Sequence, residues 1–243
     1  NKVATLTVPD SFYYLSPEDA NRVLVEAWGN PPGSMTLGML FPSKFSPLHP
    51  QAWGVTIEYE EDGYVSDENA NEINYDELLS QMQDDTQTSN EQRLDAGYSA
   101  IELVGWAAPP HYSADSHKLY WAQELQFSQV EQNTLNYNIR ALGRQGVLVL
   151  NFVAGMEQLA EIESNLNAVM AMTEFDQGHR YEEFDPAIDK VAAYGIGALV
   201  AGKVIAKTGM IAGLLILLKK FGVIIVVAAA ALFSRVFKRN KQA

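Results

Sequence analysis

The sequence predicts an α+β fold: a mainly antiparallel sheet with flanking helices, followed by a C-terminal membrane helix region. Three observations predict this class. Segments with the alternation and the β-branched and aromatic content of strands outnumber segments with helical spacing. Most neighbouring strand segments are joined by short turn sequences, which favours antiparallel hairpins. Finally, the 43 residues 191–233 contain no Asp, Glu, Asn or Gln.

Two helices and three strands are expected in the first half of the chain. Residues 16–19 read Ser-Pro-Glu-Asp, which combines a capping Ser, a Pro at the first helical position and two acids in the first turn. The Gly- and Pro-rich residues 29–33 end this helix. An acidic loop over 60–74 precedes a second segment of helical spacing at 75–96. Strands are expected at 3–8, 35–42 and 53–59.

Strands dominate the second half. Four are expected, at 99–107, 118–127, 133–143 and 146–154. Pro109 and Pro110 predict a turn after the first, and residues 143–146 (Gly-Arg-Gln-Gly) predict a tight hairpin between the last two. An amphipathic helix is expected at 157–175, and 178–190 reads as an extended, charged segment that ends the domain.

Charge divides the chain into two unequal parts. Residues 1–190 hold all thirty acidic residues and nine basic ones, a formal charge of −21, whereas 191–243 hold eight basic residues and no acid. An acidic body repels nucleic acid, because nucleic-acid binding depends on neutralising phosphates. A basic, apolar tail is attracted to phospholipid surfaces. We therefore expect a lipid bilayer, and not nucleic acid, as a partner.

The apolar tail is too long for one membrane span. A continuous helix over 191–233 would be roughly 65 Å long, about twice the thickness of a bilayer core. The tail must therefore break, and Thr208-Gly209 is the expected place. The predicted organisation is an acidic soluble α+β domain (1–190), a juxtamembrane apolar helix (191–208), a transmembrane helix (209–233) and a basic cytoplasmic tail (234–243).

The span at 209–233 has one unfavourable feature, the Lys219-Lys220 pair near its middle. Two lysines at that depth cost roughly 5–7 kcal/mol, and the apolar residues of the span return about 4–8 kcal/mol. Insertion is therefore close to balance unless the lysines snorkel or find partners. The alternatives are two spans, interfacial helices among the headgroups, or a buried hydrophobic hairpin. The membrane residues expected in the span are Gly209, Leu214, Leu217, Phe221, Ile225 and Phe233.

The basic end of the tail predicts the orientation. By the positive-inside rule it marks the cytoplasmic side, so a single span places the acidic domain in the periplasm of a Gram-negative cell. The anchoring residues are Arg235, Lys238, Arg239 and Lys241. The spacing Gly209-x-x-x-Gly213 would let two such helices pack closely as a homodimer, although glycines are also common in membrane helices for other reasons.

Six motifs resemble a family. They are EAWGNPPG (26–33), YEEDGYVS (59–66), GWAAPPHY (105–112), HKLYWA (117–122), NTLNYNIR (133–140) and DKVAAYG (189–195). Together they are similar to an uncharacterised family of predicted membrane-anchored bacterial proteins, a domain of unknown function, over essentially the whole chain. The resemblance implies an export signal upstream of Asn1 and a periplasmic domain at the inner membrane. It brings no substrate, cofactor or catalytic residues.

A second resemblance concerns the fold alone. The expected series of strand, tight turn, strand, loop and helix over 133–175 is similar to the C-terminal half of PsbP/Mog1-like domains.

Metal chemistry has one candidate. The chain has no cysteine, which excludes thiolate sites and disulfides. His111, Asp115 and His117 lie within seven residues and are of ligand types that zinc takes, but their spacing matches no zinc signature. The alternative is a hairpin loop whose histidines pack on Tyr112 and Tyr120. No resident cofactor is expected.

Two further candidates concern ions. Residues 67–71 (Asp-Glu-Asn-Ala-Asn) begin like a calcium loop but lack its Gly and its closing Glu, so a solvated acidic loop is the favoured interpretation. Arg140 and Arg144 flank the hairpin turn at 143–146 and could bind an anion, although arginines at such positions are more often simply solvated.

These observations leave two main hypotheses. The first is a non-enzymatic, membrane-tethered binding or scaffold module of the envelope, with an envelope protein as its partner. The second is an envelope hydrolase or metal-dependent enzyme centred on His111, Asp115 and His117. A calcium-responsive module is a third. The motifs of serine hydrolases, zinc proteases and phosphate loops are absent from the sequence.

Overall fold

The computed structural model describes residues 2–33, 36–128 and 130–202. Residues Asn1–Ala201 form one compact unit. This unit includes residues 191–201, which the sequence analysis placed in the segment 191–208. Residues 203–208 of that segment, the transmembrane helix expected at 209–233 and the basic tail at 234–243 lie outside the described residues. Within the described ranges, no helix is both long and apolar enough to cross a membrane.

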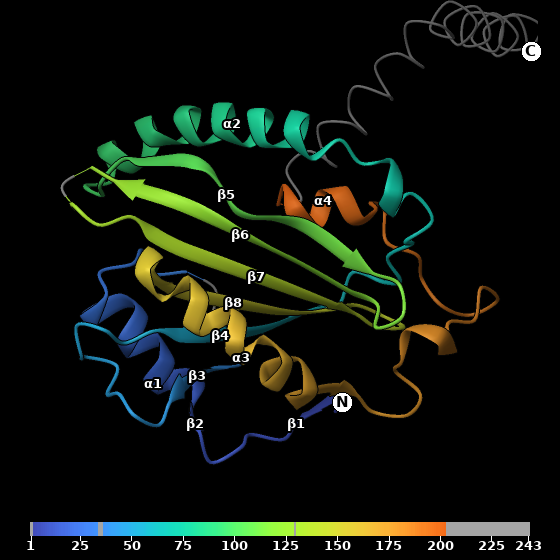
Figure 1. Ribbon diagram of the computed structural model, residues 1–243. Coiled ribbons are helices and arrows are strands. Elements are labelled where there is room, and N and C mark those ends of the chain that lie inside the picture. The colour runs from blue at the N-terminus through green and yellow to red at the C-terminus, as the bar shows by residue number, and fades with distance from the viewer. Residues whose placement is uncertain (1, 34–35, 129, 203–243) are drawn as a thin grey trace, which may run out of the picture. The chain divides into compact units, whose positions relative to one another are not determined.

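The unit is built on a seven-stranded sheet in which every neighbouring pair is antiparallel (Figure 1). The α+β class with a mainly antiparallel sheet is thereby confirmed. The strand order is β2-β3-β4-β8-β7-β6-β5, and β1 and β9 form a separate two-stranded sheet. The strands are β1 (Ala4–Leu6), β2 (Phe12–Leu15), β3 (Gly38–Pro42), β4 (Gly54–Glu60), β5 (Ile101–Ser113), β6 (Lys118–Phe127), β7 (Thr134–Leu142), β8 (Val147–Gly155) and β9 (Thr173–Phe175).

The helices begin where the sequence supplies caps. Ser16 Oγ accepts a hydrogen bond from the backbone amide of Asp19. Asn74 Oδ1 accepts hydrogen bonds from the backbone amides of Asp76 and Glu77. The α-helices are α1 (Pro17–Asn21), α2 (Tyr75–Asp95), α3 (Leu159–Met172) and α4 (Ile196–Val200). A π-helical turn, η1 (Arg22–Ala27), continues α1, and three 3-10 turns are η2 (Ala70–Glu72), η3 (Met156–Gln158) and η4 (Tyr181–Glu183).

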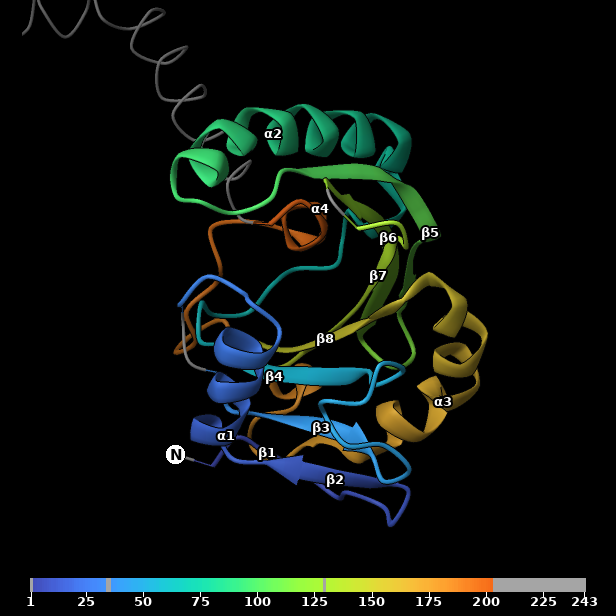
Figure 2. The same cartoon turned by 90° about the vertical axis from the view of Figure 1, so that its left-hand side faces the viewer.

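Helices lie on both faces of the sheet. Helix α3 covers one face and α4 the other, while α2 runs along the edge strand β5 (Figures 1 and 2). Side chains of α2 hydrogen-bond to the backbone of that edge: Asn90 both accepts from the amide of Ile101 and donates to its carbonyl, each at 2.8 Å. An edge strand is thereby protected from pairing with another chain.

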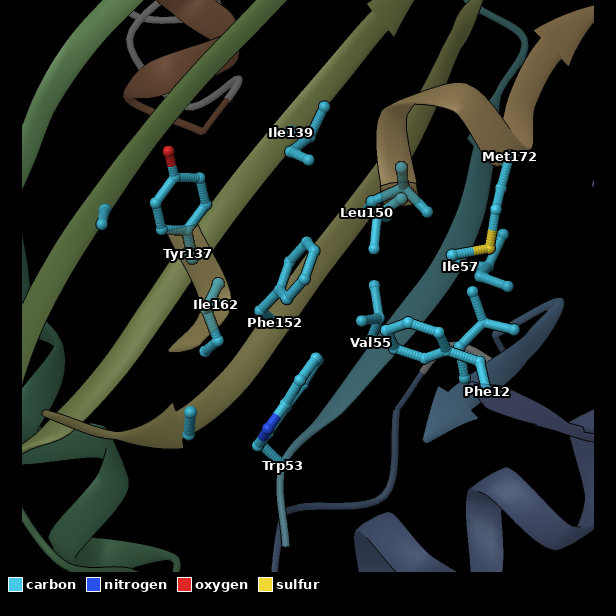
Figure 3. Packing of buried hydrophobic residues seen from close by; sticks show 14 of the residues in the cluster. Phe12, Trp53, Val55, Ile57, Tyr137, Ile139, Leu150, Phe152, Ile162 and Met172 are labelled. Atoms are coloured by element: carbon cyan, nitrogen blue, oxygen red, sulfur yellow. The ribbon is translucent and has the colours of Figure 1, made fainter. Parts of the chain in front are cut away.

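Alternation along the strands divides the buried residues between the two faces. On β8, Leu148, Leu150 and Phe152 point into the first core cluster, under α3, and Val147 and Val149 point into the second, under α4. Figure 3 shows the first core cluster, where the Trp53 ring stacks on Phe152 with centroids 5.9 Å apart. The second core cluster includes Val65, Met82, Trp121, Tyr181, Ile196 and Leu199.

The hairpin expected at 143–146 is confirmed, since the amide of Gly143 donates to the carbonyl of Gly146 at 2.8 Å. Two other expectations are corrected. Pro109 and Pro110 do not end their strand, because β5 is an edge strand with register shifts at this point, and an edge tolerates residues that lack an amide hydrogen. The helix expected at 157–175 ends at Met172, and residues 173–175 pair instead with β1.

Candidate functional site

The structure does not bring the three metal candidates together. His111 is exposed on β5, with its ring 5.0 Å from that of Tyr120, and Asp115 is exposed in the following turn. His117 lies at the end of that turn, with Nδ1 3.3 Å from the hydroxyl of Tyr112. Successive strand residues point to opposite faces, so His111 and Tyr112 diverge. In the part of the chain that the structure describes, no three His, Asp or Glu side chains are placed to hold a metal.

His117 belongs instead to what we term the tyrosine–histidine cluster: Tyr64, Asp67, Tyr112, His117 and Tyr181. The Tyr112 hydroxyl donates to Asp67 Oδ2 at 2.6 Å, and His117 Nδ1 is 3.8 Å from the same oxygen. The Tyr181 ring lies between those of His117 and Tyr64, at 4.2 and 4.5 Å. The cluster is therefore assembled from the loop after β4, the β5–β6 turn and η4.

Burial governs the electrostatics of this cluster. It raises the pKa of Tyr112 far above its usual value, and the hydrogen bond to Asp67 raises it further. Burial also raises the pKa of Tyr181 strongly, with Tyr64 and Asp67 adding to the effect. Both phenols stay protonated at neutral pH and donate hydrogen bonds, Tyr181 to the carbonyl of Val65 at 3.0 Å. The arrangement holds the His117 ring in place beside the Asp67 carboxylate.

A hollow of about 400 Å³ adjoins the cluster, and we call it the His117 hollow. Lys118 lies on its wall, where its ammonium group donates to the carbonyl of Met170 at 2.9 Å. Burial lowers the pKa of Lys118, an effect that Glu174 opposes. Arg180 and Glu182 are exposed on the rim. The hollow thus offers charges of both signs around an aromatic floor formed by Phe175 and Tyr181.

The two arginines near the hairpin are not simply solvated. Arg144 Nε donates to Asp189 Oδ2 at 2.7 Å, and the Asp189 side chain is only 3% exposed. The hydrogen bond from Arg144 holds the pKa of Asp189 below its usual value. Arg140 is half-buried on the α4 side of the sheet, where it contacts Asn138 and Asn151. Arg144 is therefore part of a structural ion pair, whereas the side-chain hydrogen-bond partners of Arg140 are neutral and the carboxylates of Glu60 and Glu58 oppose the lowering of its pKa by burial.

The acidic loop around residue 67 is also committed to internal contacts. Asp67 accepts from Tyr112, and Asp62 accepts from the hydroxyl of Tyr194 at 2.7 Å. Sequence reasoning missed the partnership of Tyr64 with Tyr181, because the two are 117 residues apart and no local spacing connects them. The one available signal was the density of tyrosines in segments that flank strands.

Comparisons with known proteins agree with the resemblance to a family of unknown function. The family model described as "Protein of unknown function (DUF2167)" matches residues 1–230. None of the curated proteins matches the chain. Among solved structures, the chain is similar to the solution structure of cyanobacterial PsbP (CyanoP) from Synechocystis sp. PCC 6803, with 10% identity, 71% of this chain and 86% of that chain covered, and a TM-score of 0.37. At this TM-score the similarity carries no further conclusion.

Proposed function

The chain belongs to the family described as "Protein of unknown function (DUF2167)", so its role has to be inferred from the chain itself, and we propose that it is a membrane-anchored envelope protein whose acidic domain is a non-enzymatic binding or scaffold module. The tail would anchor it in the inner membrane, with the domain in the periplasm.

The polarity of the sequence supports the anchor. Residues 209–233 are apolar apart from the pair Lys219-Lys220, and basic residues follow them. A domain with a charge of −21 over residues 1–190 is repelled by an anionic lipid surface, so it stands in the aqueous phase while the tail holds it nearby.

One observation carries the binding role: the groups best suited to chemistry are used to hold each other. Asp67 accepts from Tyr112, whose hydroxyl is also within 3.3 Å of His117, and Tyr181 donates to a backbone carbonyl. One oxygen of the aspartate and both phenol hydroxyls take part in internal hydrogen bonds, which fix the positions of these side chains. The resulting rigid surface beside the His117 hollow suits recognition of an envelope protein partner.

Fractionation of cells that make the full-length chain with an export leader tests the anchor. We expect the chain in the membrane pellet after a carbonate wash, and a variant lacking 209–243 in the soluble fraction. A reporter active only in the periplasm, fused at Lys190, should be active. Full-length chain in the supernatant would refute the anchor.

The binding role is tested by cross-linking at the rim of the His117 hollow. Arg180→Glu reverses an exposed charge there, and Arg22→Glu reverses an exposed charge at the start of η1 as a matched control. We expect a discrete cross-linked partner with the wild type and with Arg22→Glu, and its loss with Arg180→Glu. Metal bound by the purified chain and lost in both His111→Ala and His117→Ala would instead favour the metal-dependent enzyme.

A further inference from the structure

A pocket of about 470 Å³ lies between β1 and the main sheet, and we call it the N-terminal pocket. Strands β1 and β9 share no hydrogen-bonded ladder with the seven-stranded sheet, so side chains must fill the space between the two sheets. Here they fill it incompletely. The volume lies within the range of about 300–1,000 Å³ that is usual for small-molecule sites. The walls include Lys2, Leu6, Tyr14, Leu37, Ile57 and Tyr59.

The N-terminal pocket is apolar at its inner end and charged at its mouth. Ile57 and Leu148 form the inner end, since both are only 3% exposed and belong to the first core cluster, where Figure 3 shows Ile57. Leu37 is 52% exposed and the Lys2 side chain 73%, so these two residues mark the mouth. A ligand that matches this gradient has a long apolar body and a single polar end.

The two aromatic walls of the pocket are held in place by the fold. The Tyr14 hydroxyl donates to the carbonyl of Leu37 at 2.6 Å, which ties two wall residues together. The Tyr14 ring lies against Gly38, which has a φ of +133° and where a Cβ would collide with the ring. A Cβ at Gly146 of the hairpin turn would likewise collide with the Tyr59 side chain. Walls that are already in place reduce the entropy lost when a ligand binds.

Lys2 is the only cation among the residues that line the pocket. Its ammonium nitrogen is 3.9 Å from Asp176 Oδ2, well beyond the roughly 2.8 Å of a charge-assisted hydrogen bond. The other oxygen of Asp176 accepts from the hydroxyl of Thr5 at 2.7 Å. The ammonium hydrogens of Lys2 are therefore available to an anionic group at the mouth. Because Asp176 opposes such a group, the apolar part of the ligand must supply most of the affinity.

We propose that the N-terminal pocket binds a free fatty acid, with the methyl end of its chain against Ile57 and Leu148 and its carboxylate beside Lys2. Burial of the chain dominates the affinity, because an exposed ion pair contributes little. A phospholipid of an anionic bilayer is the poorer ligand, since residues 1–190 carry a charge of −21 and are repelled by that surface. The site goes beyond the binding role proposed above: it shares no lining residue with the His117 hollow and requires neither that hollow nor the tail.

Photolabelling tests this site in an unfractionated extract of cells that make the full-length chain, so the result does not depend on where the chain fractionates. The probe is a dodecanoate with a diazirine near its methyl end, and mass spectrometry locates the label. We expect saturable labelling around Ile57 and Leu148, displaced by dodecanoate at a concentration at least about tenfold below that of butyrate, whose chain buries fewer methylene groups. A phosphatidylglycerol with the same photoreactive chain should not label these residues. Any labelling of 209–233 by probe dissolved in lipid should not saturate.

Ala4→Phe fills the pocket from β1 and should weaken displacement by dodecanoate about tenfold or more, the effect of denying burial to two methylene groups. Thr5→Phe is the matched control. It makes the same substitution at the next residue of β1, where the side chain is exposed and points to the opposite face. Labelling around Ile57 should be unchanged in this control.

Lys2→Glu tests the carboxylate end. It should weaken displacement by dodecanoate about threefold, as suits an exposed ion pair, and leave displacement by dodecanol unchanged. Circular dichroism verifies the folding of each purified variant, and Lys2→Glu, on an exposed residue, keeps the test decisive if Ala4→Phe does not fold. Saturable labelling confined to 209–233, equal labelling of the wild type and a folded Ala4→Phe, or preferential labelling by the phosphatidylglycerol probe would overturn the assignment. So would displacement by dodecanoate that is the same for Lys2→Glu and the wild type.

Discussion

The two faces of the sheet differ in the polarity of the side chains that they bury. Under α3, the first core cluster is almost wholly apolar, and its rings pack edge-on or stacked, as between Phe12, Trp53, Phe152 and Tyr137. Under α4, apolar residues alternate with buried or half-buried tyrosines, the asparagines around Arg140 and the Trp121 indole, whose nitrogen has no hydrogen-bond partner among the described residues. Native cores retain few such polar groups. The first face is therefore the more uniformly apolar one, and polar groups gather on the second.

The largest expected effect is on the first face. Phe152→Ala removes a fully buried ring that contacts Trp53 and Tyr137, and should lower the free energy of unfolding by about 3–5 kcal/mol. Urea unfolding followed by circular dichroism measures this change. Leu94→Ala is the control, because Leu94 is 58% exposed and its loss should be nearly neutral. Equal losses for the two variants would contradict the role of this face.

The second expected effect depends on pH and concerns mainly the second face. Burial raises the pKa values of Tyr112, Tyr181 and Tyr194, and that of Tyr137 on the first face to about 12. A raised pKa means that these phenols ionise first in the unfolded chain. Their stabilising contribution is complete below pH 10 and is lost above it, at up to about 1.4 kcal/mol per pH unit for each tyrosine.

A titration of tyrosinate absorbance against pH, beside near-ultraviolet circular dichroism, measures this loss. We expect a group of tyrosines that ionise only together with unfolding. Tyr112→Phe should make the alkaline transition less steep, whereas Tyr14→Phe, on an exposed tyrosine, should not. If all tyrosines titrated near pH 10 while the fold remained intact, the burial of the cluster would be wrong.

A smaller effect is expected when the tyrosine–histidine cluster is cut at one bond. Tyr112→Phe removes the hydroxyl that donates to Asp67 and should reduce the free energy of unfolding at pH 7 by about 1.5 kcal/mol, as is typical of a hydrogen bond to a charged group. The resonance of the His117 ring should also shift, since its Nδ1 loses a neighbour at 3.3 Å. A variant with wild-type stability and an unchanged His117 resonance would show that the cluster is not a connected network.

The smallest effect on stability is expected at Arg140. Arg140→Met replaces a desolvated cation by an apolar side chain of similar length, so the free energy of unfolding should change by no more than about 1 kcal/mol, in either direction. A loss as large as that of Phe152→Ala would place Arg140 among the structural residues and remove the contrast between the faces.

Sequence patterns predicted the middle of the sheet well and its margins less well. Strands β6, β7 and β8 alternate regularly, and Gly143–Gly146 joins β7 to β8, so local signals agree with the tertiary structure there. Strand β5 passes through Pro109 and Pro110 because an edge needs fewer amide donors, a property of position in the sheet and not of local sequence. Strand β9 exists because β1 is available to pair with it, and helical spacing alone extended α3 too far.

The candidate site shows the same limit more sharply. His111 and His117 are close in sequence but lie on opposite sides of the hairpin, whereas Tyr64 and Tyr181 are far apart in sequence and stack. The sequence singled out Arg140 as a candidate for anion binding, but its burial and its contacts with Asn151 and Trp121 depend on neighbouring strands. The sequence therefore indicated which residue types could take part in a site, but it did not indicate which of them lie together in space.

The pairing of strands that are far apart in sequence has a consequence for how the chain folds. Strand β4 sits beside β8, with Gly54 opposite Val153, and β1 pairs with residues 173–175. Contacts between such distant segments form slowly, because long loops must close first. During synthesis, strands β2, β3 and β4 therefore precede the partner of β4. The edge of β4 stays unpaired until β8 has been made. A chain that crosses a membrane unfolded would meet no obstacle from premature closure, and interrupted synthesis before residue 147 would leave an aggregation-prone fragment.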